Sequence, residues 1–114
     1  MVSMPIVSTY TLAKRLDGEI TRILAAARAA GLLEGKVEQE TKLLKRDLTD
    51  ARLDIRDYEL AETKAEQQQL GDGASKRLAR VEQSILAVSQ HDIFSALEVA
   101  KLSAQIAQLQ EQLQ

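Results

Sequence analysis

His91 is the residue of this chain best suited to acid–base or metal chemistry, and two carboxylates, Asp92 and Glu98, follow it closely. Protein zinc sites combine several histidine or cysteine ligands at short, recognisable spacings. This chain has one histidine and no cysteine, so its sequence does not complete such a set. We therefore expect neither a metal nor another cofactor, and we interpret His91 as a surface or packing residue.

Acidic residues are frequent between positions 38 and 62, which raises the question of a catalytic carboxylate pair. They alternate with basic residues at steps of three and four, as charged residues do when they pair along the surface of a helix. The segment Gly71-Asp72-Gly73 lacks the Lys-Ser/Thr pair that completes a phosphate-binding loop. We therefore expect that the protein is not an enzyme and has no small-molecule substrate. The basic residues in this region are Lys42, Lys45, Arg46, Arg52 and Arg56.

Residues 9–30 carry a net positive charge, and cations of this kind can contact phosphates. The whole chain has a net charge of -2 and three aromatic residues, so it offers little for stacking on bases. A small regulatory nucleic-acid binder that uses this basic helix is the alternative function, although we expect neither nucleic acid nor membrane as the partner. The composition predicts no membrane span and, with no cysteine, a cytoplasmic location. The cations of the segment are Lys14, Arg15, Arg22 and Arg28.

The elements that carry these residues are predicted from the spacing of apolar positions. Alternating steps of four and three run from position 16 to 65, where twelve of fifteen positions are apolar, and from 78 to 113, where nine of eleven are. This spacing is typical of coiled-coil helices, whereas a strand alternates every two residues. The 114-residue chain, with 16 alanines and 17 leucines, is therefore predicted to be all-α.

The predicted architecture is a long antiparallel helical hairpin that assembles into a helical bundle. Two glycines flank Asp72 and can form a tight reversal, so helices are expected at about 9–30, 35–70 and 74–113, with the turn at 71–73. Because the apolar spacing continues through Gly31 and Gly35, we favour one long helix over 9–70; the alternative is an N-terminal helix that folds back. Residues 1–8 are expected to be an irregular lead-in to a single helical domain, 9–114.

A hairpin that reverses at Asp72 sets Asp92 opposite Ala51, close to Arg52 and Arg56. A carboxylate at an apolar seam position is costly unless it is paired. We therefore predict a contact of Asp92 with Arg52 or Arg56 that fixes the register of the hairpin. The alternative is a local rotation of the helix that turns Asp92 to solvent.

Apolar residues outside the two seams predict a further partner. The last helix is apolar on two sides, and such a helix is buried between two neighbours. A long first helix would also expose apolar residues near its start. We expect a homodimer or higher homo-oligomer, or another helical protein, to cover these residues, and a coiled-coil interaction function as a scaffold, adaptor or chaperone-like subunit. The predicted interface residues are Leu16, Ile20, Ile23, Leu24, Leu86, Ile93 and Leu97.

Overall fold

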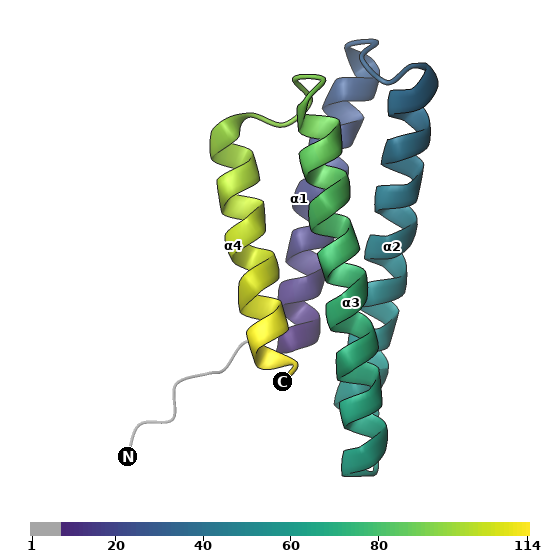
Figure 1. Cartoon of the computed structure of the whole chain (residues 1–114), viewed down its shortest axis with the longest axis vertical. Helices are drawn as coiled ribbons and strands as arrows, with labels where there is room; N and C mark the ends of the chain where they lie inside the picture. Colours follow the sequence, from purple (N-terminus) through teal and green to yellow (C-terminus); the bar gives the residue numbers. More distant parts are fainter. Residues whose placement is uncertain (1–7) are drawn as a thin grey trace.

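The computed structural model describes residues 8–114, and the regular structure in that range is entirely α-helical (Figure 1). The prediction of an all-α chain is therefore confirmed for these residues. Residues 1–7, which make up most of the predicted lead-in, lie outside the described residues. The helices within 8–114 are α1 (Thr9–Ala29), α2 (Gly35–Leu60), α3 (Lys64–Ser89) and α4 (Ala96–Gln112).

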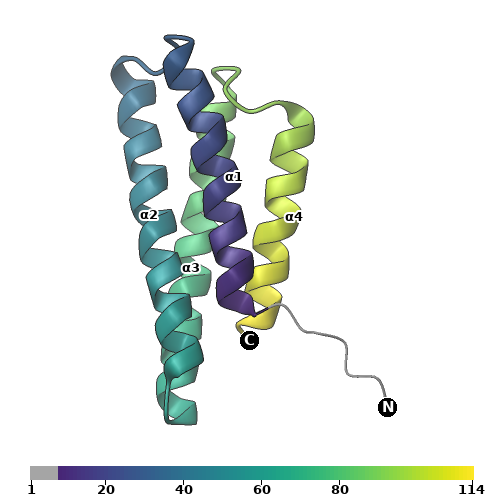
Figure 2. The ribbon, with the colours of Figure 1, turned by 180° about the vertical axis from the view of Figure 1, so that it is seen from behind.

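The helices lie side by side as a bundle, and consecutive helices run in opposite directions (Figures 1 and 2). α1 packs against α2 and α4, and α3 packs against the same two helices from the other side. The Cα atoms extend over 48 × 30 × 18 Å. The hairpin of α2 and α3 projects beyond the ends of α1 and α4 at the lower end of Figure 1. The predicted additional helix at the N-terminus is thus α1, folded back along the rest of the chain.

α1 and α2 are separate helices, so the expectation of one continuous helix over 9–70 is wrong. The N–H of Gly31 donates to the carbonyl of Arg28 (3.0 Å), and the N–H of Leu32 donates to the carbonyl of Ala27 (3.0 Å). This pair of bonds ends a helix and requires a residue in the left-handed backbone conformation. Glycine adopts this conformation at little cost. Gly31 has φ +75° and Gly35 has φ +56°, so the chain turns between them.

The predicted reversal at 71–73 is also wrong, because these residues lie inside α3. The chain reverses earlier, at 61–63, and the side chain of Thr63 accepts a hydrogen bond from the N–H of Glu66 (3.1 Å). This cap satisfies one of the free amides in the first turn of α3. The chain can therefore leave α2 and start a new helix without glycine.

A second reversal, at 90–95, divides the predicted helix 74–113 into parts of α3 and α4. Ser95 and Glu98 form a capping box: the Ser95 hydroxyl accepts from the N–H of Glu98 (3.1 Å), and the Glu98 carboxylate accepts from the N–H of Ser95 (2.9 Å). Asp92 lies in this connection with φ +60°. The observed bundle therefore contains two shorter helices where one long hairpin arm was predicted.

Most of the core of the bundle consists of the predicted apolar positions, although the helices begin and end elsewhere. The core residues from other positions are Ala13, Leu24, Ala74, Ile93 and Phe94. The largest fully buried side chains in the described range all occupy the predicted positions. Burying each such side chain contributes about 1.5–3 kcal/mol before conformational entropy is counted. These side chains are Leu16, Ile20, Leu44, Leu48, Ile55, Leu78, Val81, Ile85, Val88, Leu102, Ile106 and Leu109.

Candidate interaction groove between α1 and α4

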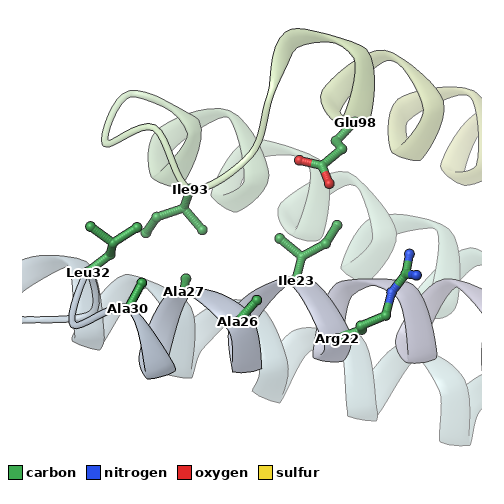
Figure 3. A pocket seen from close by; sticks show the side chains of 8 residues that line it. All are labelled: Arg22, Ile23, Ala26, Ala27, Ala30, Leu32, Ile93 and Glu98. Atoms are coloured by element: carbon green, nitrogen blue, oxygen red, sulfur yellow. The ribbon is translucent and has the colours of Figure 1, made fainter.

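An open, largely apolar hollow of about 490 Å³ lies between α1 and the start of α4 (Figure 3). Its floor on α1 is made of small side chains, which leave space between the two helices. Leu32 and Ile93, from the two nearby connections, close one end. Arg22 and Glu98 stand at the other end. The complete lining is Arg22, Ile23, Ala26, Ala27, Ala30, Leu32, Ile93 and Glu98.

The hollow continues along α4 into a second one of about 200 Å³, which shares Arg22, Ile23 and Glu98 with the first. Leu97 and Lys101 line this second part. We use the name α1/α4 groove for the two hollows together. Its central residues are Ile23, Ala26, Ala30, Leu32, Ile93 and Leu97, with Arg22 and Glu98 at the rim.

The α1/α4 groove is open because alanines face it from α1 and because α4 begins only at Ala96, after the connection at 90–95. Leu97, in the first turn of α4, is 81% exposed, and Leu32 is 48% exposed. Ile23 is half-buried. Large apolar side chains that gather at a concave surface are typical of sites that bind another protein. The geometry therefore favours contact with an apolar partner.

The rim of the groove carries two opposite charges at a similar height on the bundle. Among residues 8–114, neither Arg22 nor Glu98 takes part in an ion pair within 4.0 Å. Further along the same two helices, Lys101 Nζ lies 3.5 Å from Glu19 Oε1, and Gln105 Nε2 donates to Glu19 Oε2 (3.3 Å). The groove therefore ends, toward the N-terminus of α1, at a polar contact between α1 and α4.

The structure places the predicted interface residues in three different environments. Leu16 and Ile20 are 0% exposed and Leu24 is 6% exposed, so the predicted apolar overhang of a long first helix does not exist. These residues are covered within the bundle because α1 folds back and packs against α2 and α4. Ile23, Ile93 and Leu97 meet at the α1/α4 groove, where Ile93 is itself 7% exposed, Ile23 is half-buried and Leu97 is exposed.

Leu86, the remaining predicted interface residue, lies on α3 and is 42% exposed. It does not line the α1/α4 groove. A partner contact at this position stays a prediction. The groove is therefore defined without Leu86.

The predicted pairing of Asp92 with Arg52 or Arg56 is not found. Arg52 Nη1 lies 3.4 Å from Asp17 Oδ2, and Arg56 Nη2 lies 3.2 Å from Asp57 Oδ1. Asp92 is exposed in the connection between α3 and α4. The reason is the earlier reversal at 61–63, which leaves Asp92 at the end of the bundle where α2 begins, whereas Arg52 lies in the second half of α2.

A nearly buried carboxylate on α1, which sequence reasoning missed, joins α1 to α2. Asp17 is 8% exposed, and its Oδ1 lies 2.7 Å from Lys45 Nζ and accepts from the hydroxyl of Thr21 (3.0 Å). Arg52 approaches the other oxygen. The sequence signal was available, since Asp17 and Thr21 each directly follow a residue of the apolar seam. This cluster joins the two helices, and within it Arg52 Nε is buried without a hydrogen-bond partner.

A similar polar contact joins α2 to α3. Arg77 Nε donates to Asp54 Oδ2 (2.9 Å), and Arg77 Nη1 donates to Asp50 Oδ2 (3.3 Å). Arg77 therefore provides the connection between α2 and α3 that the sequence assigned to Asp92. Because the guanidinium group has several donors in a fixed geometry, one side chain can contact both carboxylates.

The basic residues of α1 do not share one face. Arg28 Nη1 forms an ion pair with Glu38 Oε1 (3.1 Å) on the side of α2, and Lys14 lies over the ring of Tyr10, 5.6 Å from its centroid. Arg15 and Arg22 line hollows on the side of α4 instead. The charges available for phosphates are thus distributed over different sides of the helix.

Other kinds of site are not found within the described range. His91 is exposed, and residues 8–114 contain no group of three histidine, cysteine, aspartate or glutamate side chains placed to hold a metal ion. In the same range, none of the helices combines the length and apolar character that crossing a membrane requires. Comparison with known proteins found no matching family model, no matching curated protein and no matching solved structure.

Proposed function

We propose that this protein is a non-enzymatic protein–protein interaction module, a scaffold, adaptor or chaperone-like subunit, that receives a helix in the α1/α4 groove. The observation that carries this proposal is the position of Leu97. This leucine is 81% exposed at the edge of an apolar hollow. Covering it favours the binding of a partner, because apolar area is removed from water.

The shape and charges of the groove support a helix as the occupant. Ala26 on α1 and Ala30, its C-cap, are exposed, and side chains this small let a second helix come close, as at the packed faces of helical bundles. The hollow of about 490 Å³ accepts large apolar side chains from that helix. Arg22 and Glu98 at the rim can each pair with an opposite charge, which favours an amphipathic helix with an acidic and a basic residue beside its apolar stripe.

The proposal is tested by photo-crosslinking in cells that express the full chain. A photo-reactive phenylalanine analogue replaces Leu97 in one variant and Leu43 in the control. Leu43 is a suitable control because it is 55% exposed but lies on α2, outside the α1/α4 groove. We expect a covalent adduct of defined mass from position 97 and none of that mass from position 43, with the crosslinked protein identified by mass spectrometry.

A second substitution establishes that the adduct forms in the groove. Ala26→Glu places a carboxylate in the apolar hollow at an exposed position, so the fold should persist and circular dichroism should be unchanged. We expect this variant to lose the adduct from position 97. Identical adducts from positions 97 and 43, or an adduct that survives Ala26→Glu, would contradict the proposed use of the groove.

A further inference from the structure

We infer that the partner in the α1/α4 groove is the same groove of a second copy of this chain, related by a twofold axis that runs along the bundle. The inference rests on the proposed interaction function and adds the identity of the partner. A twofold interface brings one surface patch against itself, so the patch must be complementary to its own rotated copy. The relative heights and directions of α1 and α4 meet this condition.

Contacts within the chain fix which residues of α1 and α4 lie at the same height. Thr9 Oγ1 donates to Gln112 Oε1 (2.9 Å), and Lys101 contacts Glu19 (3.5 Å). α1 and α4 therefore run in opposite directions with these residues aligned. Rotation about an axis parallel to the bundle preserves height and exchanges the two helices, so α1 of one copy faces α4 of the other, again antiparallel.

The rim charges become complementary under this rotation. Arg22 and Glu98 line the same hollow from opposite helices, and within the described residues neither belongs to an ion pair. In the dimer, Arg22 of each copy faces Glu98 of the other. The symmetry thus forms two interchain ion pairs from two residues that have no ion-pair partner among the described residues, while one Glu98 oxygen also accepts from the N–H of Ser95 in the cap of α4.

The apolar residues fit the same arrangement. The alignment of α1 with α4 sets Leu97 at a height between Ile23 and Ala26. After rotation, Leu97 of the second copy faces this part of α1, where alanines leave a hollow of about 490 Å³. A large side chain that enters a space between residues of the facing helix is the packing of coiled-coil interfaces. The exposed leucine and the open hollow therefore cover each other in both copies.

The size of the face predicts a reversible dimer. α4 has 17 residues, so it is about 25 Å long, and two helices side by side are about 20 Å wide. A face of roughly 500 Å² per chain is at the small end of specific interfaces. We therefore expect monomer and dimer to exchange with concentration, rather than an obligate dimer.

The experiment is sedimentation equilibrium of the full chain over a wide concentration range. We expect the mean mass to rise from 12.6 kDa toward twice that value. Leu97→Glu should weaken the dimer by roughly tenfold or more, because a carboxylate from each copy enters an apolar hollow. Leu43→Glu, at an exposed leucine on α2, should leave the dissociation constant unchanged.

A charge exchange between two chains tests the predicted ion pairs directly. Arg22→Glu and Glu98→Lys should each weaken self-association, because each variant brings like charges together across the axis. An equimolar mixture should recover the dimer, since the introduced glutamate of one variant faces the introduced lysine of the other, and the second pair is the native one. Within each variant chain, positions 22 and 98 carry the same charge whether or not the chains are mixed. A rescue by mixing therefore requires contact between the two chains.

The outcomes separate this inference from the proposed function. A chain that stays at 12.6 kDa at all concentrations overturns the dimer, as does a dimer insensitive to both Leu97→Glu and the charge exchange. In that event, a groove-dependent adduct with a different protein at position 97 preserves the proposed function. If Glu98→Lys lowers helicity by removing the cap of α4, Ala26→Glu, which is distant from that cap, provides the same test of the interface.

Discussion

Gly71 of α3 and Leu113, at the end of α4, approach so closely that a side chain at position 71 has no room. A Cβ atom at Gly71 would lie 2.7 Å from the backbone oxygen of Leu113 and 3.1 Å from Cε2 of Tyr58. This glycine costs α3 about 1 kcal/mol of helix propensity relative to alanine. In return, it lets the last turn of α4 dock on α3, with Leu113 4% exposed.

Gly71→Ala is therefore expected to destabilise the protein by about 1–3 kcal/mol, although alanine is the better helix former. The cause is displacement of the end of α4 and partial exposure of Leu113. Chemical denaturation followed by circular dichroism measures the change. Gly18→Ala is the matched control: it lies in α1, and no atom of the described residues outside its own helix segment lies within 4 Å of a Cβ there. The free energy of unfolding of the control should rise by about 0.5–1 kcal/mol. An equal rise for Gly71→Ala would contradict the close contact.

Asp17→Ala should destabilise the bundle by about 1–3 kcal/mol, because breaking such a pair leaves unbalanced charge in a partly desolvated place. The carboxylate is nearly buried between α1 and α2, and its loss leaves Lys45 and Arg52 without their shared partner. Equilibrium unfolding in urea measures the effect.

Glu38→Ala is the control for Asp17→Ala, because it removes an ion pair between the same two helices. Its partner Arg28 has a side chain that is 63% exposed, and exposed pairs of this kind contribute about 0–1 kcal/mol. We expect Glu38→Ala to lower the free energy of unfolding clearly less than Asp17→Ala does. Equal effects would show that the burial of Asp17 has no energetic role.

Arg77→Lys should cost about 1 kcal/mol of stability, because a lysine cannot reproduce two contacts in the fixed geometry of a guanidinium group. Arg77 contacts Asp54 and Asp50 at 2.9 and 3.3 Å. Arg80→Lys provides the comparison, since Arg80 has one contact of 3.6 Å and a side chain that is 61% exposed. Thermal unfolding should show a decrease in melting temperature for Arg77→Lys and almost none for Arg80→Lys; the reverse order would refute the bridging role.

Two substitutions at Asp92 should affect the stability of the protein differently. Its φ of +60° is strained for residues with a Cβ atom, less so for aspartate than for alanine. Asp92→Gly should therefore be neutral or stabilise by up to about 1 kcal/mol, whereas Asp92→Ala should destabilise by about 1 kcal/mol. If Asp92 instead fixed the register through a charged contact, both substitutions would lower stability, which denaturation curves would reveal.

The sequence alone determined most of the residues that form the core. The apolar positions read from the steps of three and four supply most of the buried core, including Leu44, Ile85 and Ile106, although Ala30 at such a position is exposed and Phe94 outside them is buried. The helix starts could also be read locally, because Thr63 and Ser95 each precede a glutamate by three residues, the pattern of a capping box. These two residues are the N-caps of α3 and α4, at the ends of the reversals at 61–63 and 90–95.

The role of Gly71 could not be read from its neighbours in the chain. A Gly-Asp-Gly segment is compatible with a turn and with a tightly packed helix, and the choice depends on the end of α4, which is distant in sequence. The same limit applies to Asp17, whose partners Lys45 and Arg52 are brought close by the fold.

Tertiary structure alone decided what covers each apolar face. Leu16, Ile20 and Leu24 are buried by helices of the same chain, whereas Leu97 on α4 stays exposed beside the α1/α4 groove. The physical reason is that the hydrophobic effect depends on the area removed from water and has no direction. Periodicity therefore shows that a face is to be buried, and the lengths and ends of the neighbouring helices determine which element buries it.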